Sequence, residues 1–305
     1  MVGVSPDSRP TVGAFIDDPL AHPLVRPDHR LGRRSSVLAI VPHYKCEAWL
    51  GDCLDSLVRQ THPLDGIVVV DDGSGAPPAE IVRSFPQVTL FASAENVGPY
   101  RISQEVIVRT AYDAYLFQDA DDWSLPTRLA LLLAEAERTG AEIVGCQAHR
   151  LISEEGEVVP LTYPRDVNAA LERAPTGHAV IHPSSIVTRD LVMRIGGYAT
   201  GLKFGADTEF EQRAVHVARM VNISQFAYVV RNRANSLTSS PETGLRSAER
   251  LAQGQIRTER ARENAARVAT GSQPDLTPLS VAGPLPLTYI LGPRLQSADG
   301  GTWPA

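Results

Sequence analysis

The sequence has few of the residues that mark several common classes of protein. It contains only three cysteines, Cys46, Cys53 and Cys146, and their spacing is not that of a metal site. A low, odd cysteine count fits a reducing compartment. No apolar run is long enough to span a membrane, and Pro and Asp interrupt the first 19 residues where a signal peptide needs an apolar stretch. These absences predict a cytoplasmic protein.

Lysine is also scarce. Lys45 and Lys203 are the only lysines, and the net charge is −6, so nothing indicates a nucleic-acid partner. Arginines between residues 246 and 267 alternate with glutamates, which is typical of a solvated helix face. The alternative for that stretch is a peripheral contact with a membrane or another subunit. Nothing in the sequence indicates an oligomeric state.

From residue 36, short β-branched runs alternate with amphipathic segments. This alternation predicts an α/β fold with a mostly parallel sheet flanked by helices, in which ligands bind beyond the carboxyl ends of the strands. The expected strands are 36–42, 66–72, 87–92, 114–118 and 141–148, and the expected helices are 48–60, 77–85, 99–112 and 125–140.

The pattern changes along the chain and suggests a division into parts. Residues 1–35 are rich in Pro, Asp and Arg and are expected to form a flexible arm, and residues 271–305 carry several Pro and Gly and are expected to be loosely held. The full expected division is an arm at 1–35, a domain at 36–240 with a nucleotide-binding half at 36–150 and an acceptor half at 151–240, a helix at 241–270 and a tail at 271–305.

Three polar clusters follow expected strands: Pro42–Lys45, Asp71–Ser74 and Asp119–Asp122. Because neighbouring parallel strands end at one edge of a sheet, these clusters should meet there. Crowded carboxylates repel unless a positive charge lies among them. The Asp119-x-Asp121 spacing therefore suggests a site for Mg²⁺ or Mn²⁺, which prefer carboxylate and phosphate oxygens. The alternative is a solvated turn that caps the next helix.

The second cluster contains Asp71 and Asp72 in "VVVDDGSG". One interpretation is that this cluster forms an Asx-type turn and has no role in binding. No G-x-G-x-x-G motif follows, so a dinucleotide site is disfavoured. A carboxylate at this edge can instead accept hydrogen bonds from a base or a ribose, which favours nucleoside recognition.

Several motifs occur in a defined order over residues 36–240, namely "LAIVPHYKCEAWLGDCLDSLVRQTHPLDGIVVVDDGSG", "ENVGPYR", "YLFQDADDWSLP", "SSIVTRDLVMRIGGY", "GADTEFEQRA" and "RNRANSLT". This series resembles the family 2 glycosyltransferases. The resemblance implies a GT-A fold and inverting transfer of a sugar from a nucleotide sugar, with a divalent metal as cofactor.

The resemblance also implies roles for individual residues. The implied nucleotide contacts are Pro42 and Tyr44 at the base, Asp71 and Asp72 at the base or ribose, Asn96 and Gly98 in the adjoining loop, and Asp119 at the ribose. Asp121 is implied as the metal ligand and Asp207 as the catalytic base. Arg231 and Arg233 lie in the stretch that closes over the diphosphate.

The chain departs from the family pattern at three places. Lys45 replaces the usual Asn, and residues 102–104 lack the usual arginine, for which Arg101 could substitute at a shifted register. Arg233 stands where many members have a histidine. Arg233 cannot ligate a metal, so we expect it to contact phosphate directly.

The helix expected near Asp207 offers two carboxylates for the base, and Asp207 is preferred over Glu209 by family position. Thr208 and Glu211 have the spacing of a capping box, which predicts that the helix begins there. His182 is a weaker candidate for lining the acceptor site.

The function expected from these observations is metal-dependent transfer of a sugar from a UDP- or dTDP-sugar to an acceptor hydroxyl. Neither the donor sugar nor the acceptor can be identified. The alternatives are a nucleotidyltransferase that makes nucleotide sugars and a non-catalytic binding protein that kept the fold. The first is disfavoured because "PHYKCEAW" stands where nucleotidyltransferases carry a Gly- and Arg-rich loop.

Overall fold

The structure is a computed structural model that describes residues 20, 22–26, 30–152, 156–233, 236–238 and 243–304. Most of the expected N-terminal arm lies outside the described residues. Its described end is attached to the domain, since Leu31 is buried and Arg26 forms an ion pair with Asp190 at 2.5 Å. No helix in the described ranges combines the length and the apolar composition needed to cross a membrane.

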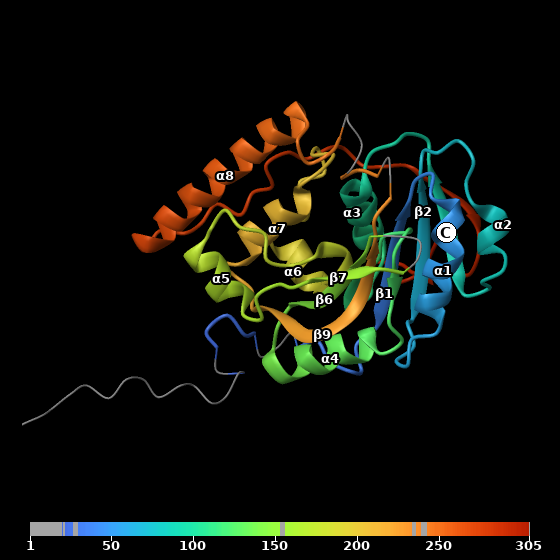
Figure 1. The fold of residues 1–305 in the computed structure, drawn as a ribbon, viewed down its shortest axis with the longest axis horizontal. Helices are drawn as coiled ribbons and strands as arrows, with labels where there is room; N and C mark the ends of the chain where they lie inside the picture. Colours follow the sequence, from blue (N-terminus) through green and yellow to red (C-terminus); the bar gives the residue numbers. More distant parts are fainter. Residues whose placement is uncertain are drawn as a thin grey trace, which may run out of the picture.

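One large mixed sheet forms the centre of the molecule (Figure 1). Its strands are β1 (Val37–His43), β2 (Gly66–Asp72), β3 (Val88–Ser93), β4 (Ala114–Phe117), β5 (Trp123–Ser124), β6 (Ile143–Leu151), β7 (Val158–Leu161), β8 (Ile186–Thr188), β9 (Met220–Arg231) and β10 (Leu287–Leu291). The strand order is β10-β3-β2-β1-β4-β8-β6-β9-β5, and β7 pairs with β6. Strands β3, β2, β1 and β4 are parallel, as are β6 and β9.

Helices cover both faces of this sheet (Figure 1). They are α1 (Glu47–Val58), α2 (Ala79–Val82), α3 (Pro99–Arg109), α4 (Arg128–Thr139), α5 (Val167–Arg173), α6 (Arg189–Arg194), α7 (Ala206–Ala214) and α8 (Ala248–Ala269), with a 3₁₀ turn at His182–Ser184. The predicted α/β fold class is confirmed. The expected helix at 77–85 is reduced to the single turn of α2.

The central strand β1 shows why the sheet is buried on both sides. Successive side chains of a strand point to opposite faces. Val37, Ala39 and Val41 pack in one core with side chains of α1, α2 and α4. Leu38 and Ile40 pack in the other core with side chains of α3, α5, α6 and α7. A continuous apolar run is therefore required, and "VLAIV" supplies it.

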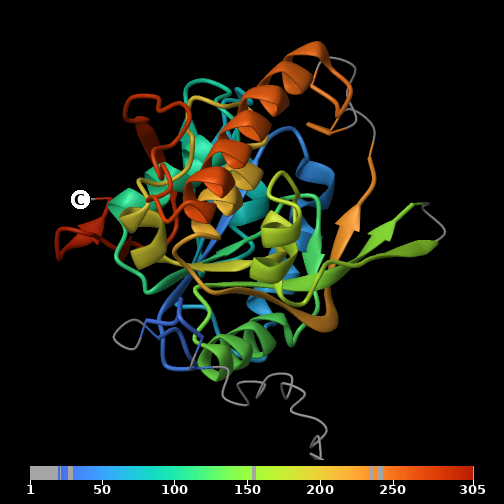
Figure 2. The ribbon, with the colours of Figure 1, turned by 90° about the vertical axis from the view of Figure 1, so that its left-hand side faces the viewer.

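The C-terminal segment differs from the expectation of a loosely held tail. From α8 it runs to the far edge of the sheet (Figures 1 and 2, red), where β10 pairs antiparallel with β3. Trp303 stacks on Phe91 with ring centroids 4.1 Å apart, and Leu285 and Leu295 are buried beside them. The expectation was wrong because Pro and Gly make the backbone irregular without preventing single apolar side chains from joining a core.

Candidate active site

The carboxyl ends of β1, β2 and β4 lie side by side. His43 at the end of β1 is paired with Asp71 at the end of β2, and Ile40 of β1 is paired with Phe117 of β4. The three polar clusters therefore follow adjacent parallel strands at one edge of the sheet. The predicted convergence of these clusters is confirmed by this register.

Asp71 holds the loop that follows β2. Its carboxylate lies 3.0 Å from Nδ1 of His43 and accepts the main-chain N–H of Ser74 at 3.0 Å. Burial alone would raise the pKa of Asp71, but the hydrogen bonds from His43 and Ser74 outweigh that effect and hold the pKa below its usual value. Asp71 is thus an ionised side chain at the strand end where the nucleotide site is expected.

Asp72 holds the loop that contains Asn96 and Gly98. Its carboxylate accepts the N–H groups of Val97 at 2.7 Å and Gly98 at 2.9 Å, and the side-chain amide of Asn96 at 3.1 Å. Gly98 has φ +88°, and a Cβ there would lie 3.0 Å from the carbonyl oxygen of Lys203. Only glycine suits this backbone and this close approach. Asp72 and Asn96 are therefore engaged in holding the loop.

Pro42 and Tyr44 lie at the same edge, with Pro42 in β1 half-buried and Tyr44 40% exposed. The Tyr44 ring is thus partly exposed where the resemblance implies a base, with Nζ of Lys45 5.1 Å from its centroid. Arg101 lies elsewhere, because its guanidinium donates to the carbonyl of Gly283 at 3.0 Å. In the described part of the chain, Arg101 forms no ion pair with an acidic side chain.

The third cluster brings three carboxylates together. Ligand oxygens of Asp119, Asp121 and Asp122 all lie within 4.8 Å of one another. The pKa of Asp119 is raised to about 7, first because surrounding protein atoms displace water and then because of the charges of Asp121 and Asp207. The Asp119 side chain is exposed to solvent, so water weakens both the effect of burial and this repulsion. The pKa of Asp122 is raised chiefly by burial.

These oxygens fit a divalent cation. Hard cations prefer carboxylate oxygens, and a bound positive charge relieves the repulsion that raises the pKa of Asp119. Asp122 is the least available of the three, since it is buried and accepts the N–H of Arg231 at 2.7 Å. Asp119 and Asp121 are therefore the better-placed ligands.

Arg231 and Arg233 reach this cluster from the end of β9. Arg233 forms an ion pair with the carboxylate of Asp121, and Arg231 donates to the Asp121 carbonyl at 3.1 Å. Tryptophan rings support both guanidinium groups: Arg231 lies 5.0 Å from the ring centroid of Trp123, and Arg233 lies 5.5 Å from that of Trp49. The two predicted arginines are thus brought to the predicted metal ligand.

Helix α7 carries Asp207 and does not begin as predicted. The helix begins at Ala206, after Gly205 with φ +77°, and no side chain caps it. Thr208 lies inside the helix and bonds Nδ1 of His178 at 3.1 Å, while Glu211 lies 3.4 Å from the same nitrogen. The capping-box prediction was wrong because both of its side chains bind a histidine from another segment.

Asp207 lies among groups that stabilise its charge. Burial would raise the pKa of Asp207, but His178, His182 and hydrogen bonds from Thr208 and Tyr100 together hold it below the usual value. The same carboxylate contributes to the raised pKa of Asp119. Asp207 and the acidic cluster therefore belong to one site.

The two histidines near Asp207 are in opposite states. Although burial opposes it, Glu211 raises the pKa of His178 to about 9, so this ring is protonated at neutral pH. Burial lowers the pKa of His182 to about 4 and keeps it neutral. Nε2 of His182 lies 3.0 Å from the Tyr198 hydroxyl, and its ring stacks on Phe117 with centroids 4.1 Å apart.

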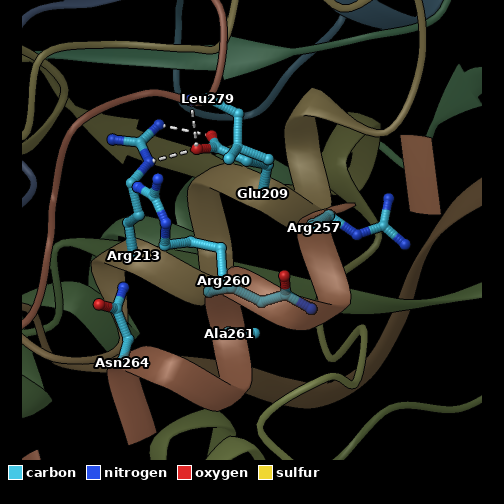
Figure 3. Close-up of a pocket in the computed structure, with 8 residues that line it drawn as sticks. Glu209, Arg213, Arg257, Arg260, Ala261, Asn264 and Leu279 are labelled. Carbon is cyan, nitrogen blue, oxygen red and sulfur yellow. Dashed lines mark hydrogen bonds and ion pairs between the residues drawn. The ribbon is translucent and has the colours of Figure 1, made fainter. Parts of the chain in front are cut away.

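Glu209, the other candidate base, is fully engaged elsewhere. Its two oxygens accept from Nε and Nη2 of Arg213 at 2.7 Å each, and one also accepts the N–H of Leu279 at 3.2 Å (Figure 3). Both members of this pair are buried. Glu209 therefore anchors α7 to the C-terminal segment, whereas Asp207 has no such partner.

Sequence reasoning missed a buried arginine that holds the acidic loop. Arg128 has no exposed surface, and its guanidinium lies 4.7 Å from the Tyr228 ring centroid. It donates to the side chains of Gln118 and Ser124 and to the carbonyls of Phe117 and Pro183. These bonds join both ends of the Asp119–Asp122 loop. An arginine at the start of an apolar helix was the available signal.

Tyr100 and His178 were also missed. Neither belongs to a pattern that marks a site in the sequence, and only the fold brings each of them to Asp207. His182, a weaker candidate from the sequence, does lie in this group.

Curated relatives resemble the chain over part of their length. The uncharacterized glycosyltransferase EpsJ of Bacillus subtilis is 26% identical over 220 residues, which cover 67% of this chain and 63% of EpsJ. The glycosyltransferase GlyA of Streptococcus pneumoniae is 34% identical over 90 residues, which cover 28% of this chain and 13% of GlyA. The chain thus spans less than two thirds of the length of these relatives.

Solved structures share the fold. The S. aureus TarS 1-349 structure in complex with UDP has a TM-score of 0.58 at 20% identity and covers 76% of this chain and 65% of that one. The complex with UDP-GlcNAc has a TM-score of 0.59 at 20% identity, covering 76% and 73%. The predicted GT-A architecture is therefore confirmed. The model of the family described as Glycosyl transferase family 2 matches residues 38–196, just over half of the chain, and the protein belongs to that family.

Proposed function

We propose that the protein transfers a sugar from a nucleoside-diphosphate sugar to an acceptor hydroxyl, with inversion at the anomeric carbon. One observation carries this proposal. The carboxylate at the start of α7 lies near the end of β4, which the acidic cluster follows, because Phe117 of β4 stacks on His182 and Tyr100 contacts both His182 and Asp207. The charges of Asp121 and Asp207 accordingly both act on Asp119. Such a site can bind a diphosphate on one side and activate a hydroxyl on the other.

The proposed donor is a UDP-sugar or dTDP-sugar. The fold is shared with TarS, which has been crystallised with UDP and with UDP-GlcNAc. In this chain the partly exposed ring of Tyr44 and the ionised Asp71 lie at neighbouring strand ends, where a base and a ribose would be held. Asp72, Asn96 and Gly98 would act by holding the adjoining loop in place.

The proposed cofactor is Mg²⁺ or Mn²⁺, held by Asp121 with Asp119 beside it. When bound, the cation neutralises charge on the diphosphate, which is worth several kcal/mol to the departing group. Arg231 and Arg233 would contribute further positive charge to the diphosphate. Arg233 is placed for this by its ion pair with Asp121, which a cation would replace.

The proposed base is Asp207. It would take the proton of the acceptor hydroxyl while that oxygen attacks the anomeric carbon from the face opposite the diphosphate. The bond between the anomeric carbon and the diphosphate oxygen breaks, and the nucleoside diphosphate leaves with the bonding electrons. A low pKa keeps Asp207 ionised and able to accept the proton. The buried pair that Glu209 forms with Arg213 supports Asp207 rather than Glu209 in this role.

A screen of nucleotide sugars, with and without Mn²⁺, tests the proposal. The expected result is metal-dependent release of a nucleoside diphosphate from a subset of UDP- or dTDP-sugars. Release of pyrophosphate would support a nucleotidyltransferase instead. Absence of metal-dependent binding or release with every donor would support a binding protein that kept the fold.

A further inference from the structure

Two arginines of α8 lie beside the start of α7, where Asp207 is. Figures 1 and 2 show α8 lying along one side of the molecule next to α7. Arg250 and Arg257 come from the N-terminal half of α8 and are both partly buried. Their guanidinium groups lie next to Gly205 and Phe204, the two residues before α7.

Arg257 is held against Gly205, the residue directly before α7. Its Nη1 lies 3.5 Å from the carbonyl oxygen of Gly205. A Cβ on Gly205 would lie 2.5 Å from the same nitrogen, so glycine is needed there both for φ +77° and for space. Arg257 lines the same pocket as the Glu209–Arg213 pair, and its side chain points away from that pair (Figure 3).

Arg250 lies on the other side of the same helix start. Its guanidinium is 4.5 Å from the ring centroid of Phe204 and donates to the carbonyls of Thr243 and Leu237 at 2.9 and 3.0 Å. Burial lowers the pKa of Arg250, whereas Asp207 and Tyr100 raise it. Asp207 is thus a carboxylate near enough for its charge to act on Arg250.

The charges around these arginines do not balance. In the described part of the chain neither Arg250 nor Arg257 forms an ion pair, whereas Arg260 of the same helix pairs with Asp275 at 2.8 Å. Arg257 Nε is buried and has no hydrogen-bond partner there. An exposed arginine such as Arg262 is solvated by water, but a shielded donor without a partner is costly.

The remaining charged groups leave this excess in place. Glu211 is taken up by the protonated His178, and Glu209 by Arg213. Asp207 is then the one carboxylate of α7 without an ion pair in the described part of the chain, and its charge acts on Arg250. Two guanidinium groups and one carboxylate leave a net positive charge beside the start of α7.

We infer that Arg250 and Arg257 bind an anionic group, a phosphate or a carboxylate, on the acceptor whose hydroxyl Asp207 activates. This inference rests on the proposed function. The planar guanidinium matches both kinds of oxyanion. An anion held by α8 would place the nearby hydroxyl against Asp207, and an acceptor without that charge would bind less well.

The test uses three probes with one sugar ring: glucose, glucose 6-phosphate and glucuronate. Each is titrated by saturation-transfer NMR onto the full chain saturated with UDP and Mg²⁺, so that the donor phosphates cannot be the binding event. Glucose 6-phosphate, glucuronate or both should bind more tightly than glucose. The comparison of the two anions separates a phosphate site from a carboxylate site.

Matched variants complete the test. Arg257→Gln should weaken binding of the anionic probe at least about tenfold. Arg257→Lys, which keeps the charge, should restore part of it, and Arg262→Gln on the exposed face of α8 should change nothing. Arg250→Gln provides a second variant if Arg257→Gln folds poorly.

Three results would overturn the inference: equal binding of glucose, no binding of either anion, or equal effects of Arg257→Gln and Arg262→Gln. UDP binding is measured separately in the same samples. A chain that binds UDP but no anionic probe contradicts this inference alone. A chain that binds an anionic probe but no UDP contradicts the proposed function and leaves the α8 site intact.

Discussion

The proposed donor side and the proposed acceptor side of the site contain the same kinds of residue in opposite electrostatic states. On the donor side, burial and the charges of neighbouring carboxylates raise the pKa values of Asp119 and Asp122. On the acceptor side, Asp207 lies near His178 and hydrogen-bond donors, and its pKa is lowered. The pKa of a carboxylate therefore depends on its neighbours, and here it separates a cluster that favours a cation from a residue that stays ionised without one.

The two sides also differ in construction. The donor side is built from the ends of three adjacent parallel strands. The acceptor side combines α7, α8, the segment with His178 and His182, and the C-terminal segment. The first arrangement follows from local sequence, whereas the second depends on contacts between distant parts of the chain. The predictions below test this difference, beginning with the largest effect.

Asp207→Asn should reduce sugar transfer by about 10²–10⁴-fold, because the general base is removed. UDP binding in the presence of Mn²⁺ should be unchanged, since Asp207 is on the acceptor side. Turnover and UDP affinity are measured on the same preparation. Full turnover in this variant would exclude Asp207 from the mechanism.

Glu209→Gln should destabilise the fold by about 3–5 kcal/mol, because it leaves the buried Arg213 without its charge partner. The free energy of unfolding is obtained from urea titration. Two residues of one helix would then have separate roles, one in chemistry and one in stability. A variant with wild-type stability and lost turnover would reverse the assignment of Asp207 and Glu209.

Trp303→Ala should destabilise the fold by roughly 3 kcal/mol, because it removes a buried ring that stacks on Phe91. Val281→Ala is the control, since Val281 is 68% exposed in the same segment and its loss should cost less than about 0.5 kcal/mol. If both variants matched the wild type in urea titration, the C-terminal segment would not be an integral part of the fold.

The two histidines should affect stability with opposite dependence on pH. The pKa of His178 is raised from 6.5 to about 9, so its contribution to stability is complete below pH 6.5 and is lost as the pH rises through 9. The pKa of His182 is lowered from 6.5 to about 4, so stability falls as the pH decreases from 6.5 toward 4.

Unfolding titrations from pH 4 to 9.5 measure both effects. His178→Gln should flatten the alkaline side of the profile, and His182→Gln the acidic side. Changes on the same side for both variants would show that the two rings do not differ in charge.

Much of the donor side could be predicted from the sequence. "VVVDDGSG" and "YLFQDADDW" each join an apolar strand to acidic residues, and strand ends in a parallel sheet must meet. The bonds of Asp72 to the main chain of Val97 and Gly98 could not be predicted, because they depend on the path of a loop about 25 residues away.

The acceptor side was less predictable for a physical reason. The start of α7 was misplaced because Thr208 and Glu211 bind His178 rather than the helix backbone. The attachment of the C-terminal segment was missed because its anchors, such as Leu295 and Trp303, are single apolar residues with no helical or strand period. Periodicity detects an element with a continuous apolar face and does not detect an irregular segment held at separate points.

The central claim is that Asp121, among the carboxylates that follow β4, holds a divalent cation that binds a diphosphate. Calorimetric titration of UDP, with and without Mn²⁺, into the wild type and Asp121→Asn tests it most directly. The account predicts metal-dependent UDP binding in the wild type and its loss in the variant. Equally tight binding without Mn²⁺, or unchanged metal-dependent binding in Asp121→Asn, would contradict it.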